Sequence, residues 1–190
     1  MAAAALYFEL GSPYSYLAVE RAGAVLGAEP ELRPILLGAI FKLRGYGSWG
    51  HTAERDSNVA EVERRAREYG LPPVAWQPGW PPNTLAAMRA CVWAGERGVG
   101  REFAVAAFRR AFVDGFDLAD IAVLRDVAAS VGLPGAQLEA AVSDPALKAA
   151  LKEITDGAWE LGVRGAPTLE VDGQLFYGDD QLERAASTIG

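Results

Sequence analysis

Two serine residues lie where a strand-like segment leads into a predicted helix. Residues 5–10 form an apolar run, and a helical pattern begins at about Tyr14, so Ser12 and Ser15 flank the start of the helix. The free N–H groups and the dipole of a helix N-terminus stabilise a developing anion, which Ser12 is placed to hold. A simpler interpretation is that Ser12 only caps the helix, with Pro13 in its first turn. On these residues alone, the cap is favoured.

Other reactive residue types are scarce. Cys91 is the single cysteine, which excludes an internal disulfide and any Cys-x-x-Cys site. It lies in an apolar helical stretch, so we expect a small core residue, with a reactive thiol as the alternative. His51 is the single histidine and has no cysteine near it at ligand spacing, so we expect no metal. We interpret His51 as a loop residue or substrate contact rather than a general base.

Length, charge and hydropathy exclude several classes of protein. The 190 residues are 51% apolar, which is enough for one sizeable core. The net charge of -7, without a long basic run, argues against a nucleic-acid partner. No apolar stretch approaches the roughly 20 residues that a membrane span needs, and residues 1–5 lack the basic region of a signal peptide. We therefore expect a cytoplasmic protein with no membrane partner.

The elements that position Ser12 begin with a βαβ unit. The strand at residues 5–10 leads into an amphipathic helix over residues 14–26, which Gly27 ends. Residues 31–37 alternate toward an apolar end and predict a second strand. Because the connection is helical, the two strands should lie parallel in one sheet.

A long helical block follows before the chain returns to strands. Residues 53–161 predict five or six helices separated by Gly- and Pro-containing turns, with no repeat at a fixed period. Residues 167–171 and 174–177 then predict two strands joined by a two-residue Asp-Gly turn. A last helix over residues 180–188 closes the chain.

This order predicts an α/β protein: a thioredoxin-like fold with a large all-helical insertion after the second strand. Residues 1–52 and 162–190 would form the thioredoxin-like domain, and residues 53–161 the helical insertion domain. In such a fold Ser12 and Ser15 occupy the positions of the two cysteines of Cys-x-x-Cys. Disulfide exchange needs thiolates, so the chain would use the same electrostatics for another purpose.

Six short segments carry a family resemblance that extends over nearly the whole chain. They are SPYSYL at 12–17, PILLGAIFK at 34–42, RAREYGLP at 65–72, PPNTLAAMR at 81–89, LGVRGAPTL at 161–169 and LFYGDD at 175–180. In this order they resemble the 2-hydroxychromene-2-carboxylate isomerases and the kappa-class glutathione transferases, the serine branch of the DsbA-like thioredoxin superfamily.

The resemblance implies a homodimer that binds glutathione or another low-molecular-weight thiol. A family serine hydrogen-bonds the sulfur of bound glutathione, and Ser12 is the matching position. Pro167 matches a cis-proline that faces the site, which leaves the backbone of Ala166 free to pair with the cysteinyl part of glutathione. Asp179 and Asp180 match the positions that hold the γ-glutamyl end, where a carboxylate complements an ammonium group.

Each of these residues also has a purely structural interpretation. Ser15 is either a second donor in the substrate pocket or an ordinary residue of the first helical turn. Pro167 on its own would be a trans-proline that opens an edge strand. Asp179 and Asp180 would serve as caps of the last helix.

Three departures from the family pattern surround the expected site. Gln181 follows the two aspartates where many members have arginine, and Tyr46 stands in the place of an asparagine. The lysine of the family has no obvious counterpart, and Arg55 is the nearest cation. These positions surround the substrate and the glycine end of glutathione, so the departures bear on the identity of both.

Aromatic side chains occupy the loops that should cover the site. Tyr46, Trp49, Trp76 and Trp80 lie in Gly- and Pro-rich segments, and Tyr14 follows Ser12 in the first helix. They would stack on a flat aromatic substrate or form a dry lid, with core packing as the alternative.

By resemblance, we expect a glutathione-dependent isomerase acting on 2-hydroxychromene-2-carboxylate or a related intermediate of aromatic degradation. Ser12 would be its catalytic residue. A kappa-like glutathione transferase or peroxidase is the first alternative. A thioredoxin-fold protein that binds a small molecule and has lost catalysis is the second.

Overall fold

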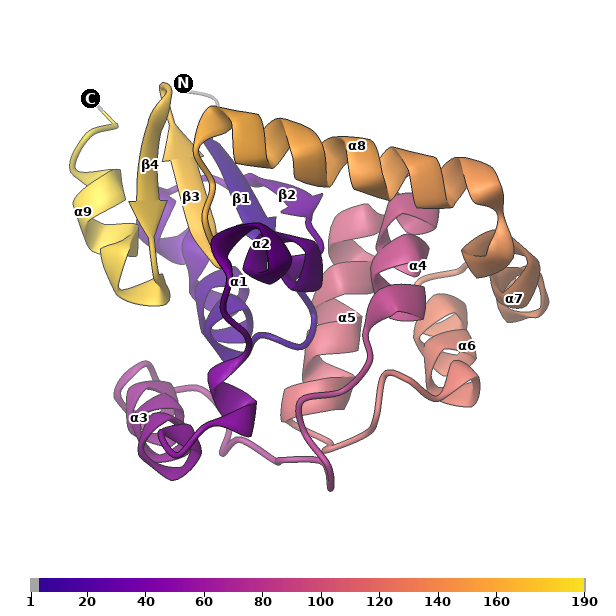
Figure 1. Ribbon diagram of the computed structural model, residues 1–190, viewed down its shortest axis with the longest axis horizontal. Coiled ribbons are helices and arrows are strands. Elements are labelled where there is room, and N and C mark those ends of the chain that lie inside the picture. Colours follow the sequence, from indigo (N-terminus) through magenta and orange to yellow (C-terminus); the bar gives the residue numbers. More distant parts are fainter. Residues whose placement is uncertain (1–3, 190) are drawn as a thin grey trace.

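A four-stranded sheet in the order β2-β1-β3-β4 organises the computed structural model, which describes residues 4–189. Strand β1 (Ala4–Phe8) pairs in parallel with β2 (Glu31–Pro34) and antiparallel with β3 (Thr168–Val171). Strand β4 (Gln174–Tyr177) completes the sheet antiparallel to β3. The parallel pair is the predicted βαβ unit, and the whole is the predicted thioredoxin-like fold (Figure 1).

The residues of β1 alternate between the two faces of the sheet, as the period of a strand requires. Leu6 and Phe8 pack in the large core cluster with helix α1 (Pro13–Leu26), which ends at Gly27 as predicted. Ala5 and Tyr7 pack in a smaller cluster with helix α8 (Pro145–Leu161). The end of β1 and the loop that follows it are therefore held from both sides.

Six helices lie between residues 55 and 161, in agreement with the predicted five or six. They are α3 (Arg55–Glu68), α4 (Leu85–Gly95), α5 (Gly100–Phe112), α6 (Ile121–Ser130), α7 (Gly135–Ser143) and α8. Figure 1 shows α4 to α7 grouped beside the sheet, with α8 running back along one side to reach it. In the part of the chain that the structure describes, no helix has both the length and the apolarity needed to cross a bilayer.

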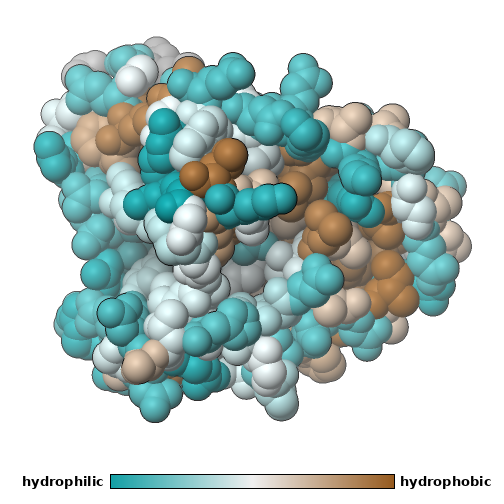
Figure 2. Space-filling model, in the orientation of Figure 1, coloured by the Kyte–Doolittle hydropathy of each residue, from teal (hydrophilic) through white to brown (hydrophobic). Residues whose placement is uncertain are grey.

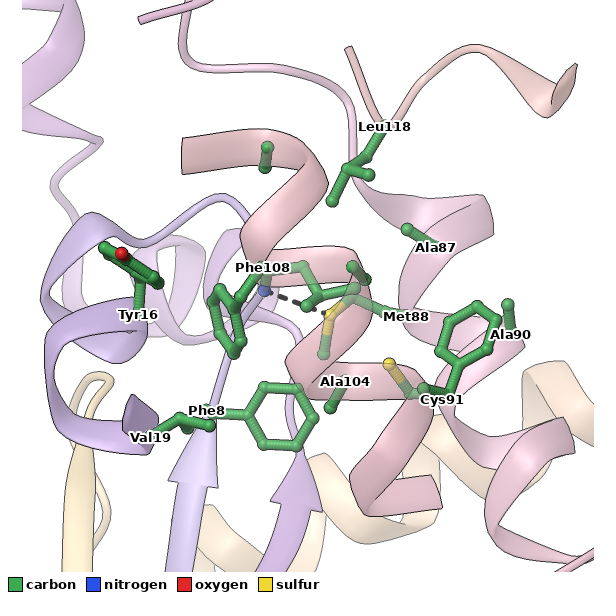
Figure 3. Packing of buried hydrophobic residues seen from close by; sticks show 14 of the residues in the cluster. Phe8, Tyr16, Val19, Ala87, Met88, Ala90, Cys91, Ala104, Phe108 and Leu118 are labelled. Atoms are coloured by element: carbon green, nitrogen blue, oxygen red, sulfur yellow. Dashed lines mark hydrogen bonds between the residues drawn. The ribbon is translucent and has the colours of Figure 1, made fainter. Parts of the chain in front are cut away.

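The helical block and the sheet share one hydrophobic core. Phe8 of β1 packs against Phe108 of α5 with ring centroids 5.7 Å apart. Met88 and Cys91 of α4 are buried in the same cluster, and the Leu10 N–H donates to Met88 Sδ over 3.3 Å (Figure 3). The predicted division into residues 1–52 with 162–190 and residues 53–161 stays a prediction, but these contacts place the block directly on the loop after β1.

Several element boundaries differ from the sequence-based prediction. The second strand ends at Pro34 rather than at residue 37, and helix α2 (Leu37–Arg44) begins in the apolar run that follows. A short apolar run does not distinguish strand from helix by periodicity. The Ile35 N–H still donates to the Phe8 carbonyl oxygen of β1 over 3.0 Å, and the Leu36 N–H then donates to Thr155 Oγ1 of α8 over 3.1 Å, where α2 begins.

The C-terminal part of the chain differs from the sequence-based prediction in one element and agrees with it in another. The predicted last helix over residues 180–188 is split into a 3-10 turn, η2 (Asp179–Gln181), and a short helix, α9 (Leu182–Ala186). The hairpin turn between β3 and β4 is confirmed, since Asp172 (φ 48°) and Gly173 (φ 79°) both have the left-handed backbone that such a turn needs.

Candidate active site

A cavity of about 950 Å³ lies where β1 passes into α1. Its walls come from the β1–α1 loop, α2, the 3-10 turn η1 (Trp49–His51) with its flanking loops, residues 80–85 before α4, and residues 165–166 before β3. Figure 2 shows the hollow between α2 and the segment that leads into α4. Segments distant in sequence therefore meet at the N-terminus of α1.

Ser12 lies on the wall of this cavity and caps α1. Its Oγ accepts the Ser15 N–H over 3.2 Å and donates to the Ala166 carbonyl oxygen over 3.3 Å. The residue is only 7% exposed. The cap interpretation is thus confirmed, and the same hydroxyl still faces a ligand-sized space beside a helix N-terminus, where an anion is stabilised.

The peptide bond between Ala166 and Pro167 is cis, as the resemblance implies. Ala166 lines the cavity, whereas Pro167 is buried behind it and its carbonyl oxygen accepts the Gly178 N–H over 3.0 Å. Among residues 4–189, the Ala166 N–H has no hydrogen-bond acceptor. A backbone donor is therefore available next to Ser12.

Ser15 lies beneath the helix rather than in the cavity. It is fully buried, and its hydroxyl accepts the Glu9 N–H at 3.4 Å. The residue three positions after the cap points back toward β1, so its hydroxyl serves the β1–α1 loop. Of the two interpretations from the sequence, the geometry agrees with the ordinary first-turn residue and not with a pocket donor.

Asp179 and Asp180 also lie outside the cavity wall. Asp179 is 1% exposed, and its carboxylate is 2.8 Å from Arg65 Nη1 and accepts the Tyr69 hydroxyl over 3.0 Å. Burial raises the pKa of Asp179, against the opposite effects of Arg65 and Tyr69. Asp180 is exposed and lies 3.4 Å from the same guanidinium. The Arg65 guanidinium also lies 5.6 Å from the centre of the Tyr14 ring, and Tyr14 lines the cavity. Arg65 therefore lies between the two aspartates and the edge of the cavity.

Four of the five aromatic side chains that were predicted to cover the site line the cavity. Tyr14, Tyr46, Trp49 and Trp80 line the cavity, and Trp49 and Trp80 pack with ring centroids 4.6 Å apart. The Trp80 indole N–H donates to the Gly11 carbonyl oxygen over 3.2 Å, which ties this cover to the loop before Ser12. Trp76 packs behind Trp80, outside the cavity.

Gly50 allows the close approach of this cover. A Cβ atom at this position would lie 2.7 Å from the Trp80 ring and 2.8 Å from Pro81, so a larger residue would force the η1 turn away. His51, next in the chain, is exposed and lines the cavity, in the place expected of a substrate-loop contact.

Glu9 is the site residue that the sequence analysis missed. It is 7% exposed, lines the cavity, accepts the Gly11 N–H over 2.9 Å at Oε2, and receives the Thr84 hydroxyl at Oε1. No lysine or arginine of the described chain lies within 4.0 Å of its carboxylate. Burial raises the pKa of Glu9 from 4.5 to about 7, although both hydrogen bonds favour the ionised form. A lone acidic residue within an apolar run was the signal available in the sequence.

Known proteins with the same architecture were found by sequence and by structure. A family model described as DSBA-like thioredoxin domain matches residues 5–190. The 2-hydroxychromene-2-carboxylate isomerase of Sphingobium xenophagum is 31% identical over 194 residues, which cover 93% of this chain and 92% of that protein. A solved structure of a 2-hydroxychromene-2-carboxylate isomerase has a TM-score of 0.89 at 21% identity, covering 98% of this chain and 94% of its own. A probable DsbA oxidoreductase of Streptomyces coelicolor has a TM-score of 0.78 at 20% identity, covering 99% and 89%.

Burial of Glu9 predicts a specific pH dependence of stability. Because the folded-state pKa is raised to about 7, the folded protein holds this proton more tightly than the unfolded chain. The stabilisation is present below pH 4.5 and is lost as pH rises toward 7. A shift of this size corresponds to about 3 kcal/mol. In urea denaturation, the free energy of unfolding of Glu9→Gln should therefore rise by about 3 kcal/mol relative to that of the unmodified protein as the pH is raised from 4.5 to about 8. If the difference in unfolding free energy between the two proteins stayed constant over this range, the raised pKa of Glu9 would be contradicted.

The two aspartates should differ sharply in their contribution to stability. Asp179→Ala removes the buried partner of Arg65 and should cost about 3 kcal/mol of unfolding free energy. The matched change Asp180→Ala, at an exposed carboxylate, should cost less than about 1 kcal/mol. Equal losses in urea denaturation would show that the Asp179 ion pair does not hold η2 against α3.

Proposed function

The chain belongs to the DSBA-like thioredoxin domain family, together with the 2-hydroxychromene-2-carboxylate isomerase of Sphingobium xenophagum, and we propose that it is a thiol-dependent isomerase. Its substrate would be 2-hydroxychromene-2-carboxylate or a related intermediate of aromatic degradation. The observation that carries the proposal is the Ser12 hydroxyl, which lies at a helix N-terminus on the wall of an aromatic cavity and next to the cis peptide of Ala166.

The chain's own cysteine is unsuited to supply the sulfur. Cys91 is 4% exposed in α4, does not line the cavity, and has its pKa raised by burial. A nucleophilic thiolate needs access and a lowered pKa. The donor set around Ser12 instead fits a diffusible thiol, glutathione or another small one. When bound, this thiol supplies the sulfur nucleophile.

The residues at the N-terminus of α1 would hold and ionise that thiol. The Ser12 hydroxyl, turned from the Ala166 carbonyl oxygen to the sulfur, and the helix dipole would both favour a sulfur anion over the neutral thiol. The free Ala166 N–H offers a strand-like contact to the peptide part of the ligand, with Pro167 fixing its direction. In this proposal the ammonium end of the ligand extends past the cavity wall to the exposed carboxylate of Asp180, and the buried Asp179 keeps Arg65 in place.

The aromatic cover would bind the substrate. A volume of about 950 Å³ exceeds what the thiol alone needs, and the rings of Tyr14, Trp49 and Trp80 offer flat apolar surface to an aromatic ring. Tyr46 and His51, which are exposed at the rim, would contact the substrate as it enters. Association into a homodimer stays a prediction.

Removal of the Ser12 hydroxyl should abolish most of the thiol-dependent activity. With glutathione and the chromene acid, Ser12→Ala should lower kcat/KM by about 10²- to 10³-fold, as expected for a lost anion-stabilising donor. Loss of the cap should cost only about 1 kcal/mol, so the variant remains folded. The control Ser57→Ala, at an exposed serine of α3 that does not line the cavity, should stay within about threefold.

Two results would contradict the proposed isomerase function. One is the absence of chromene conversion with glutathione or any other small thiol. The other is turnover of a chloro-dinitrobenzene-type electrophile without conversion of the chromene acid, which would support the transferase alternative. Thiol binding with neither activity would support the binding-protein alternative.

A further inference from the structure

Glu9 and Thr84 meet on the cavity wall from distant parts of the chain. Glu9 belongs to the β1–α1 loop, and Thr84 precedes α4 as its N-cap. A threonine at this position ordinarily uses its side chain to accept a helix N–H. Here it makes no such hydrogen bond, and Asn83 Oδ1 accepts the Leu85 N–H instead. The Thr84 hydroxyl is thereby left to pair with the Glu9 carboxyl inside the cavity.

The surroundings of Glu9 keep its carboxyl able to exchange a proton near neutral pH. From α4 the titratable group that faces it is the buried thiol of Cys91, whose pKa is raised further by the charge of Glu9. The other carboxyl group on the cavity wall, that of Glu54, is exposed. A pKa of about 7 gives Glu9 both forms at useful concentration, as a group in general acid–base catalysis requires.

The chemistry of the substrate class calls for such a group. Carbon 2 of a 2-hydroxychromene-2-carboxylate carries a hydroxyl group and the ring oxygen, so the compound is a cyclic hemiketal. Opening the ring removes a proton from that hydroxyl and adds one to the ring oxygen. Ser12 has a single hydroxyl proton, which the proposed function assigns to the sulfur of the thiol, so it is not the group that does both.

We propose that Glu9 and Thr84 form the proton-transfer pair that opens and closes the hemiketal ring of the substrate, in an inference that rests on the proposed function. Glu9 is the catalytic residue, and Thr84 conducts its proton. As the bond between carbon 2 and the ring oxygen breaks, the Thr84 hydroxyl, turned from Glu9 to the substrate, donates its proton to the ring oxygen, which becomes a phenol. The neutral Glu9 carboxyl donates its own proton to Thr84 Oγ1 in the same step.

The cycle closes on the same carboxyl group. The proton of the carbon 2 hydroxyl passes to the Glu9 carboxylate, and the electron pair of that O–H bond becomes the second bond of the new ketone. The electron pair of the broken C–O bond stays on the phenol oxygen. Nothing is oxidised or reduced, and the thiol takes no part in this step.

The test measures ring opening in the absence of thiol, by stopped-flow absorbance after mixing protein with the chromene acid. The unmodified protein should accelerate opening, and the rate should fall as pH rises through about 7, because the acid form donates the proton. Glu9→Gln keeps the size of the side chain and the one acceptor and one donor of a neutral carboxyl group, but it cannot transfer a proton. It should lower the rate by about 10²-fold or more and remove this pH dependence.

Matched variants separate proton transfer from a structural role. Thr84→Val should lower ring opening by about 10-fold or more, and Thr84→Ser, which restores a hydroxyl, should recover it. Glu54→Gln changes the other carboxyl of the cavity and should leave the rate unaltered. The affinity of Glu9→Gln for glutathione should match that of the unmodified protein within about twofold, since Ser12 and Ala166 are intact.

A spectroscopic measurement tests the protonation state without any activity. In the ligand-free protein, the infrared difference spectrum between the unmodified protein and Glu9→Gln should contain a protonated carboxyl band that titrates near pH 7. A band that titrates near 4.5 would overturn the proposal, because Glu9 would then carry no proton to give at neutral pH.

The possible outcomes distinguish this inference from the proposed function. Ring opening without thiol, but no thiol-dependent isomerisation, would contradict the proposed function and support the proton-transfer pair. Thiol-dependent isomerisation with unchanged ring opening in Glu9→Gln would support the proposed function and contradict the proton-transfer pair. If Glu9→Gln fails to fold, equal rates for Thr84→Val and Thr84→Ser would overturn the inference, as would a lack of any acceleration by the unmodified protein.

Discussion

The loop of residues 9–12 is the constraint on which the site depends, because its polar groups pair both with one another and with three distant parts of the chain. The Ser12 N–H donates to the Glu9 carbonyl oxygen over 3.0 Å and closes the turn. The Leu10 N–H reaches Met88 of α4, the Gly11 carbonyl oxygen accepts the Trp80 indole, and the Ser12 hydroxyl reaches Ala166. Three segments, those of Trp80, Met88 and Ala166, are thereby fixed around one helix N-terminus.

The shared core explains why these segments meet there. Strand β1 is buried on both faces, so its end is rigid, and α1 starts from it with the residues that follow the loop. The helical block packs on the same core through α4 and α5, which brings residues 80–85 over the loop. The cavity is the space between these two parts, with its reactive groups on the loop and its aromatic rings on the segments that cover it.

Features encoded by neighbouring residues could be predicted from the sequence, whereas those set by distant contacts could not. The strand–serine–proline–helix order identified Ser12, and the Asp-Gly pair identified the hairpin. The cis-proline at Pro167 came from the family resemblance. Glu9 was missed because its burial and its partner Thr84 come from a segment 75 positions away. The direction of Ser15, the enclosure of Asp179 by Arg65 and the start of α2 likewise depend on packing that no local pattern reports.

We propose that the N-terminus of α1 holds a small thiol as its thiolate beside Ser12. An ultraviolet difference titration of glutathione bound to the protein measures this directly, because the thiolate absorbs and the thiol does not. We expect an apparent pKa for the bound thiol at least one unit below the value of about 8.5 for a free thiol, and a return toward 8.5 in Ser12→Ala. Bound glutathione that titrates near 8.5 in the unmodified protein would contradict it.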